Sequence, residues 1–187
     1  MKRFGFILLS ILIVAGLVAV YLFWFTPLSR SSRTRNLLAF LRNPQTHTEW
    51  MSKALQRCGD APFLFPTNGY IGYLWDDSFR VGHRHQGIDI FGGGKPGETP
   101  VYAAYDGYLT RLPEWKSSVI IRIPSDPLNP GQQIWIYYTH MAFQSGESLI
   151  VSEFPPGTRE TFVKAGSLLG YQGNYSGSPG QPVGVHL

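Results

Sequence analysis

Four residues could together do chemistry: His85, Asp89, His140 and His186. The first two are four positions apart, with Gly87 between them. On a straight strand their Cα atoms would lie about 13 Å apart, too far to bind one ion. The β-branched residues beside the glycine disfavour a helix, so we expect the backbone to bend at Gly87. An imidazole nitrogen and a carboxylate oxygen that meet at such a bend are ligands that suit zinc.

The other two histidines stand far downstream. His140 follows the apolar run at 134–138, and His186 follows a glycine-rich segment at 170–180. Both positions are typical of the ends of strands, where a fold can bring side chains from distant parts of the chain into one site.

The four residues and the short sequence motifs around them resemble the motifs of the lysostaphin-type zinc endopeptidases, also called LytM peptidases, which cut peptide cross-bridges or stems of bacterial cell walls. They occur in the family's order and cover nearly everything from about residue 67 to the end. The matching blocks are His85-x-Gly87-x-Asp89, Pro100-Val101-Tyr102-Ala103-Ala104-x-x-Gly107, Tyr138-Thr139-His140-Met141, Val163-Lys164-Ala165-Gly166, Gly170-x-x-Gly173-Asn174 and Val185-His186-Leu187.

The resemblance implies a role for each of the four residues. His85 and Asp89 match two of the family's three zinc ligands. His140 and His186 match its two other active-site histidines, which bind or deprotonate the water and stabilise the tetrahedral intermediate. The family's third ligand is the second histidine of a His-x-His pair, two residues beyond His186, whereas this sequence ends at Leu187.

We therefore expect a truncated copy of a longer protein. The parent is predicted to be a zinc-dependent endopeptidase, a Zn²⁺ enzyme that hydrolyses peptide bonds of bacterial peptidoglycan. The 187-residue chain is predicted to bind metal weakly and to have little or no activity, because a catalytic zinc site ordinarily has three protein ligands.

Several alternatives stay open. His83 lies two residues before His85 and could replace the missing ligand, although a solvated histidine is the simpler interpretation. His47 has no second ligand near it in the sequence and is interpreted as a solvated or capping residue. The rival functions are a non-catalytic peptidoglycan-binding or hydrolase-activating module of the same fold, and a lipoyl or biotinyl carrier suggested by the segment around Lys164. A carrier needs its lysine at a hairpin tip, and the Asp106-Gly107 turn has none.

The elements that must position the site are mainly β. The chain is rich in glycine and proline, with 21 and 14 residues, and short runs of Val, Ile, Tyr and Phe lie between its turns. We expect an antiparallel β-sandwich or partly open barrel, of the duplicated hybrid motif type that the resemblance implies. The expected strands are 70–74, 87–91, 101–104, 107–111, 119–123, 134–139 and 168–172, with a last core strand at His186.

The N-terminal region predicts an appendage to this domain. The uncharged run from Phe4 to Phe25 would span roughly 33 Å as a helix, and its aromatic end is typical of a membrane interface. We expect three parts: a transmembrane anchor at 1–29, a short helical stalk at 30–62 and an incomplete peptidase domain at 63–187. In the stalk, the segment 37–41 predicts a short helix, and Thr46 with Glu49 resembles a capping box that opens a second helix through Arg57.

The charge distribution fits a membrane partner better than a nucleic acid. Residues 1–60 carry eight Lys/Arg against two acids, a net +6, and residues 61–187 carry eight against ten, a net −2. The basic charge therefore lies beside the predicted anchor, where it can meet lipid headgroups. Counting charges would place the C-terminal domain inside the cell, but the function requires it outside. We expect a single-pass cell-membrane protein with an extracytoplasmic catalytic domain.

Overall fold

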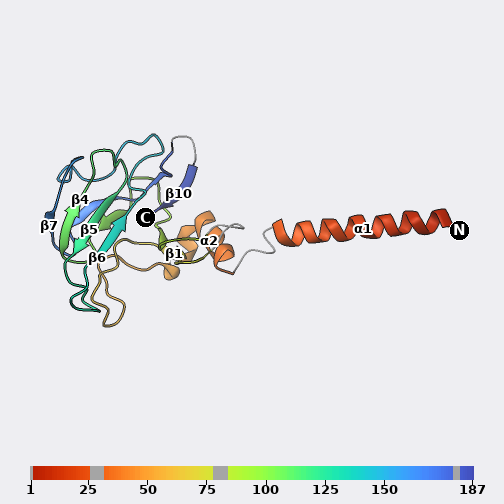
Figure 1. Ribbon diagram of the computed structural model, residues 1–187, viewed down its shortest axis with the longest axis horizontal. Coiled ribbons are helices and arrows are strands. Elements are labelled where there is room, and N and C mark those ends of the chain that lie inside the picture. The colour runs from red at the N-terminus through yellow and green to blue at the C-terminus, as the bar shows by residue number, and fades with distance from the viewer. Residues whose placement is uncertain (1, 26–31, 78–83, 179–181) are drawn as a thin grey trace.

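The computed structural model describes residues 2–25, 32–77, 84–178 and 182–187. The chain is mostly strands in small antiparallel sheets, with helices confined to the N-terminal part (Figure 1). The strands are β1 (Tyr70–Tyr73), β2 (Asp89–Phe91), β3 (Pro100–Tyr102), β4 (Gly107–Thr110), β5 (Val119–Ile123), β6 (Ile134–Tyr138), β7 (Thr161–Val163), β8 (Leu168–Tyr171), β9 (Gly173–Tyr175) and β10 (Pro182–His186).

The largest sheet has four strands in the order β6-β5-β4-β7. Its side chains alternate between two faces, as a strand's two-residue period requires. One face packs into the main hydrophobic core, where Leu109 and Ile121 are fully buried. The other face leaves Trp135, Tyr137 and Phe162 about half exposed.

Three two-stranded sheets complete the β structure: β1-β2, β3-β8 and β9-β10. The first and last of these are joined, because Ile90 of β2 and Leu187 exchange backbone hydrogen bonds of 3.0 and 3.1 Å. Leu187 packs in the main core. The C-terminal strand is thereby fixed beside β2.

The segment predicted to be a stalk packs against β1 and β2. Helix α2 (Ser32–Arg42) buries Leu37 and Phe40 against Phe91 in a second hydrophobic core. Arg33 of the same helix lies 3.4 Å from the carboxylate of Asp77. This helix is therefore fixed next to the strand that carries Asp89.

The prediction of a second helix through Arg57 is wrong. The helical segment there is the 3₁₀ helix η2 (Pro44–Trp50), and Met51 is extended. The chain cannot continue as a helix because Ser52 and Gly69 exchange backbone hydrogen bonds of 2.9 and 3.1 Å. The predicted capping box does not form, since the Thr46 hydroxyl donates to the carbonyl of Asn43.

The seven expected strands from 70–74 to 168–172 agree with the observed ones to within about two residues. The last strand, expected at His186, begins earlier, at Pro182, and β7 and β9 were not expected. Both unexpected strands are three residues long and contain little β-branched apolar sequence. Closure of the sheets into a sandwich or barrel stays a prediction.

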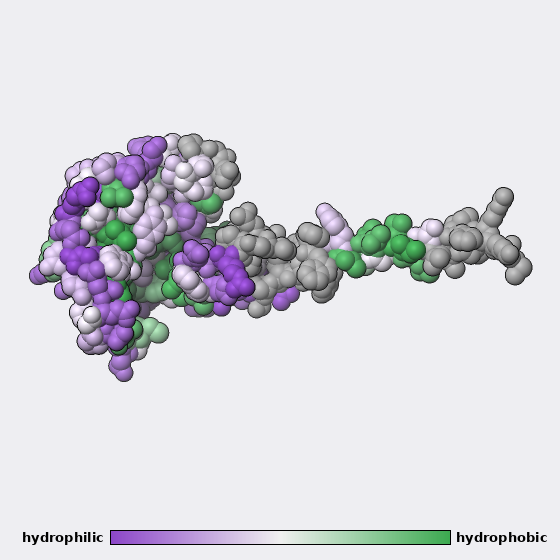
Figure 2. Space-filling model, in the orientation of Figure 1, coloured by the Kyte–Doolittle hydropathy of each residue, from purple (hydrophilic) through white to green (hydrophobic). Residues whose placement is uncertain are grey.

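Helix α1 (Lys2–Phe25) covers the predicted anchor and projects away from the strands (Figure 1). Its side chains are described from Ser10 to Tyr21, and the apolar ones are half or more exposed (Figure 2). No helix in the described part of the chain is both long enough and apolar enough to cross a membrane.

Candidate metal and catalytic site

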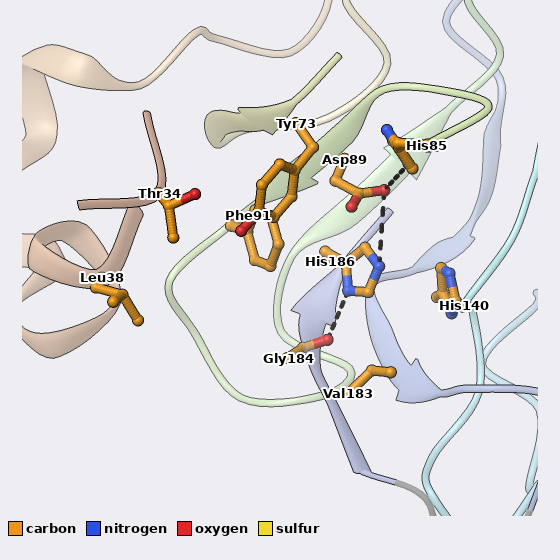
Figure 3. Close-up of a pocket in the computed structure, with 10 residues that line it drawn as sticks. All are labelled: Thr34, Leu38, Tyr73, His85, Asp89, Phe91, His140, Val183, Gly184 and His186. Carbon is orange, nitrogen blue, oxygen red and sulfur yellow. Dashed lines mark hydrogen bonds and ion pairs between the residues drawn. The ribbon is translucent and has the colours of Figure 1, made fainter. Parts of the chain in front are cut away.

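The structure brings His85, Asp89, His140 and His186 together in one place (Figure 3). They come from the loop before β2, the start of β2, the end of β6 and the end of β10. All four line one cavity of about 450 Å³.

His85 and Asp89 meet because the chain bends at Gly87, as the sequence predicts. The Nε2 atom of His85 lies 2.8 Å from Oδ1 of Asp89. The loop is held by hydrogen bonds from the amide of His85 to the carbonyl of Asp77, 2.9 Å, and from the amide of Asp76 to the carbonyl of His85, 2.8 Å. Both side chains remain partly open to solvent, at 16% and 19% exposed.

His140 has a left-handed backbone, with φ of 65°. This conformation is uncommon for residues other than glycine, and histidine is among those that adopt it more readily. It turns the chain sharply at the end of β6, so that the ring lies 4.2 Å, centroid to centroid, from the ring of His186.

His186 is buried and lies between two rings. On one side it stacks on Phe91, with centroids 4.9 Å apart and planes at 22°. On the other side it faces His140. Its Nε2 atom lies 3.9 Å from Oδ1 of Asp89. Phe91 therefore positions His186 against the carboxylate.

In all three histidines, Nδ1 bonds to a backbone carbonyl. His85 bonds to the carbonyl of Leu74 at 3.0 Å, His140 to that of Tyr175 at 2.6 Å and His186 to that of Gly184 at 2.6 Å. A carbonyl can only accept a hydrogen bond, so each Nδ1 carries the proton. In a neutral ring the Nε2 atom then presents a lone pair.

These lone pairs give the site its chemical character. At 2.8 Å, the Nε2 atom of His85 and the carboxylate of Asp89 repel each other unless a proton or a cation lies between them. The Nε2 atom of His186 adds a third negative pole nearby. His85 and Asp89 could hold a cation such as zinc between them, and the carbonyl bond at each Nδ1 is the outer support that metal-binding histidines have.

Burial keeps His140 and His186 neutral. It lowers the pKa of His140 to about 4, and the neighbouring His186 adds to this effect. Burial also lowers the pKa of His186, although its bond to Gly184 opposes the shift. At neutral pH both rings therefore keep the Nε2 lone pair, although the lowered pKa makes each a weaker proton acceptor than an exposed histidine.

The described residues do not complete a zinc site. Among them, no group of three or more His, Cys, Asp or Glu is arranged to hold a metal ion. His83, the possible replacement, lies outside the described residues. His47 lies on η2, stacked on Trp50 at 3.9 Å, and does not line the cavity.

Two pairs of residues that line the site were not predicted from the sequence. Thr34 and Leu38 of α2 line the cavity, and their spacing of four residues puts them on one helix face (Figure 3). On the opposite side, Trp135 and Tyr137 line a second cavity of about 520 Å³ that also includes His85, Asp89 and His140. The alternation of Ile and aromatic residues at 134–137 signalled two different faces of this strand.

Comparison of the chain with protein-family models, with curated proteins and with solved structures gave no match.

Proposed function

We propose that the chain carries the site of a lysostaphin-type zinc endopeptidase that hydrolyses peptide bonds of bacterial peptidoglycan. One observation carries this proposal: four motif residues, spread over 102 positions from His85 to His186, line one cavity with Asp89 at the centre. Such a convergence is expected if the motif is a site.

The two ligand candidates are His85 and Asp89, and their donor atoms suit zinc. A bound zinc ion would polarise the scissile carbonyl and lower the pKa of its bound water. The proton transfers are carried out by side chains of this chain.

His140 acts first as a base. Its Nδ1 proton is held by the carbonyl of Tyr175, so only Nε2 can take a proton from the attacking water. Once protonated, the same nitrogen can donate to the oxyanion or to the leaving amine. His186 lies beside it with the same tautomer and can serve the same intermediate.

A histidine placed directly after Leu187 would complete the proposed ligand set. Ile90 and Leu187 are directly paired, so an additional residue after Leu187 would lie opposite Asp89. Its side chain would point to the same face as that of His186, because side chains on a strand alternate. A histidine there would join His85 and Asp89.

The proposal also covers how the sheets are arranged and where in the cell the protein lies. The small antiparallel sheets are proposed to form the sandwich or partly open barrel of the family. The uncharged run from Phe4 to Phe25 is proposed to anchor the protein in the cell membrane, supported by the exposed apolar side chains of α1. The catalytic domain then lies outside the cytoplasm, where peptidoglycan is found.

A second candidate is a non-catalytic peptidoglycan-binding or hydrolase-activating module. The observation in its favour is that the described residues supply two ligands and not three. Against it, a module that only binds has no use for two neutral histidines with free Nε2 atoms beside a carboxylate.

The deciding experiment is digestion of purified peptidoglycan with zinc present, followed by mass spectrometry of the released peptides. The chain should cut little, and the chain extended by one histidine after Leu187 should cut well. His140→Asn in the extended chain should remove cleavage. An extended chain that binds zinc tightly and releases no peptide would favour the binding module.

A further inference from the structure

Two aromatic side chains next to the site have no role in the proposed chemistry. Trp135 and Tyr137 occupy alternate positions of β6 and are 54% and 53% exposed. Ile134 and Ile136 pack from the same strand against the main core. The two aromatic rings therefore lie together on the outer face of the sheet, where a ligand in solution can reach them.

These rings are continuous with the catalytic cluster. They line the 520 Å³ cavity together with His85, Asp89 and His140. A molecule bound at the histidines can therefore reach the aromatic pair without leaving the cavity.

Tyr137 is held in place before any ligand arrives. Its hydroxyl donates to Oγ of Ser118 at 2.8 Å, and Ser118 in turn bonds to Thr139 at 2.9 Å. The ring of Trp115 packs edge-on against Tyr137, with centroids 5.6 Å apart and planes at 85°. A fixed ring binds a flat partner with little loss of conformational entropy.

The rest of the cavity lining is uncharged. Apart from the site residues, it consists of Gln86, Gly87, Ile88, Ile136, Thr139 and Leu187. None of these side chains is a cation that could pair with the carboxylates of a peptide stem, and Arg122, opposite Trp135, is paired with Glu160. An uncharged ring with one apolar face would fit. The negative π faces of Trp and Tyr attract the C–H groups of such a ring, and Gln86 and Thr139 can bond to its hydroxyls.

We propose that Trp135 and Tyr137 form a subsite for an uncharged hexopyranose ring, the sugar of the glycan strand that carries the peptide substrate. This inference rests on the proposed function. It adds that the enzyme holds the glycan on the β6 side of the histidines, while the peptide bond lies over them.

The test is binding of a peptide-free sugar, the tetramer of β-1,4-linked N-acetylglucosamine, to the full chain in lipid nanodiscs. Saturation-transfer NMR titrations give the dissociation constant and need no metal or cleavage. Trp135→Ala and Tyr137→Ala should weaken binding by at least about fivefold. Tyr137→Phe keeps the ring and its contact with Trp115 but loses the bond to Ser118, so it should weaken binding less than Tyr137→Ala does.

Phe162→Ala is the matched control. Phe162 lies on the outer face of the same sheet and is 53% exposed, but it does not line the cavity. Its removal should leave sugar binding unchanged, and unfolding midpoints should show that all four variants fold.

The outcomes separate the subsite from the proposed function. Sugar binding that depends on Trp135, in a protein that cuts no peptide when extended and loaded with zinc, would retain the subsite and remove the peptidase. The subsite is overturned if the tetramer does not bind, if Trp135→Ala binds it as the unmodified chain does, or if the free stem peptide binds the aromatic pair in its place.

Discussion

Ile90 and Leu187 exchange two backbone hydrogen bonds, 3.0 and 3.1 Å long, although they are 97 positions apart in the sequence. In this antiparallel register Phe91 lies opposite His186, which explains why their rings stack at 4.9 Å. Leu187 packs in the main core and Ile90 is buried, whereas Asp89, Phe91 and His186 lie on the other face and line the site, where Phe91 also contacts the second core.

Leu38 is predicted to control access to the cavity. Leu38→Trp should fill part of the space beside His186 and lower kcat/KM for peptidoglycan at least about tenfold in the histidine-extended chain, because the substrate is displaced. The matched control is Leu41→Trp, on the same helix but 38% exposed and outside the cavity. Equal rates for both variants would show that α2 is not a wall of the substrate site.

Arg111 is predicted to be a structural cation. It is 4% exposed and donates to the carbonyls of Trp115 and Phe154 and to the hydroxyl of Ser148, at 3.1, 2.8 and 2.9 Å. Arg111→Met should lower the free energy of unfolding by about 2 to 4 kcal/mol, because buried acceptors lose their partner.

The control for this loss of stability is Arg122→Met, in β5 of the four-stranded sheet. Arg122 pairs with Glu160 on the exposed face, where solvent screens an ion pair and its loss costs much less stability. Urea unfolding of the two variants measures the difference. Similar losses would contradict the structural role given to the buried guanidinium.

The pKa of His140 predicts a pH-dependent stability of the metal-free protein. The folded pKa is about 4, below the value of about 6.5 in an unfolded chain. As pH falls below about 6.5 the unfolded state binds the proton first, so stability is full above that pH and falls toward pH 4. Between pH 7.5 and 5, this loss should be about 2 kcal/mol.

His140→Asn tests this cause, because asparagine also tolerates the left-handed backbone and does not titrate. The variant should lose about 2 kcal/mol less than the unmodified chain over the same pH range. Unfolding curves that change with pH in parallel for the two proteins would assign the effect to other groups.

Much of the β structure could be predicted from local sequence. The apolar runs at 119–123 and 134–138 predicted strands with nearly the observed limits. The wrong helix at Arg57 shows where local sequence fails, because the backbone of Ser52 is drawn into a bridge with Gly69, a partner far along the chain. No pattern at residues 46–57 records that pairing.

The candidate site, too, could be predicted from the sequence only in part. Its four chemical residues could be named because their types and spacing match a motif, and the bend at Gly87 follows from backbone freedom. The contributions of Thr34, Leu38 and Phe91 could not, since apolar residues that line a cavity have the same types as those that fill a core. They depend on how α2 packs against β2, which is a tertiary property.

The most direct test of the central claim is the zinc affinity of three proteins, measured by competition with a chromophoric chelator. They are the unmodified chain, the Asp89→Asn variant and the chain with a histidine added after Leu187. We predict weak binding by the first, at least about tenfold weaker binding by the second and at least about tenfold tighter binding by the third. Equal affinity in all three would contradict the assignment of this cluster as a zinc site.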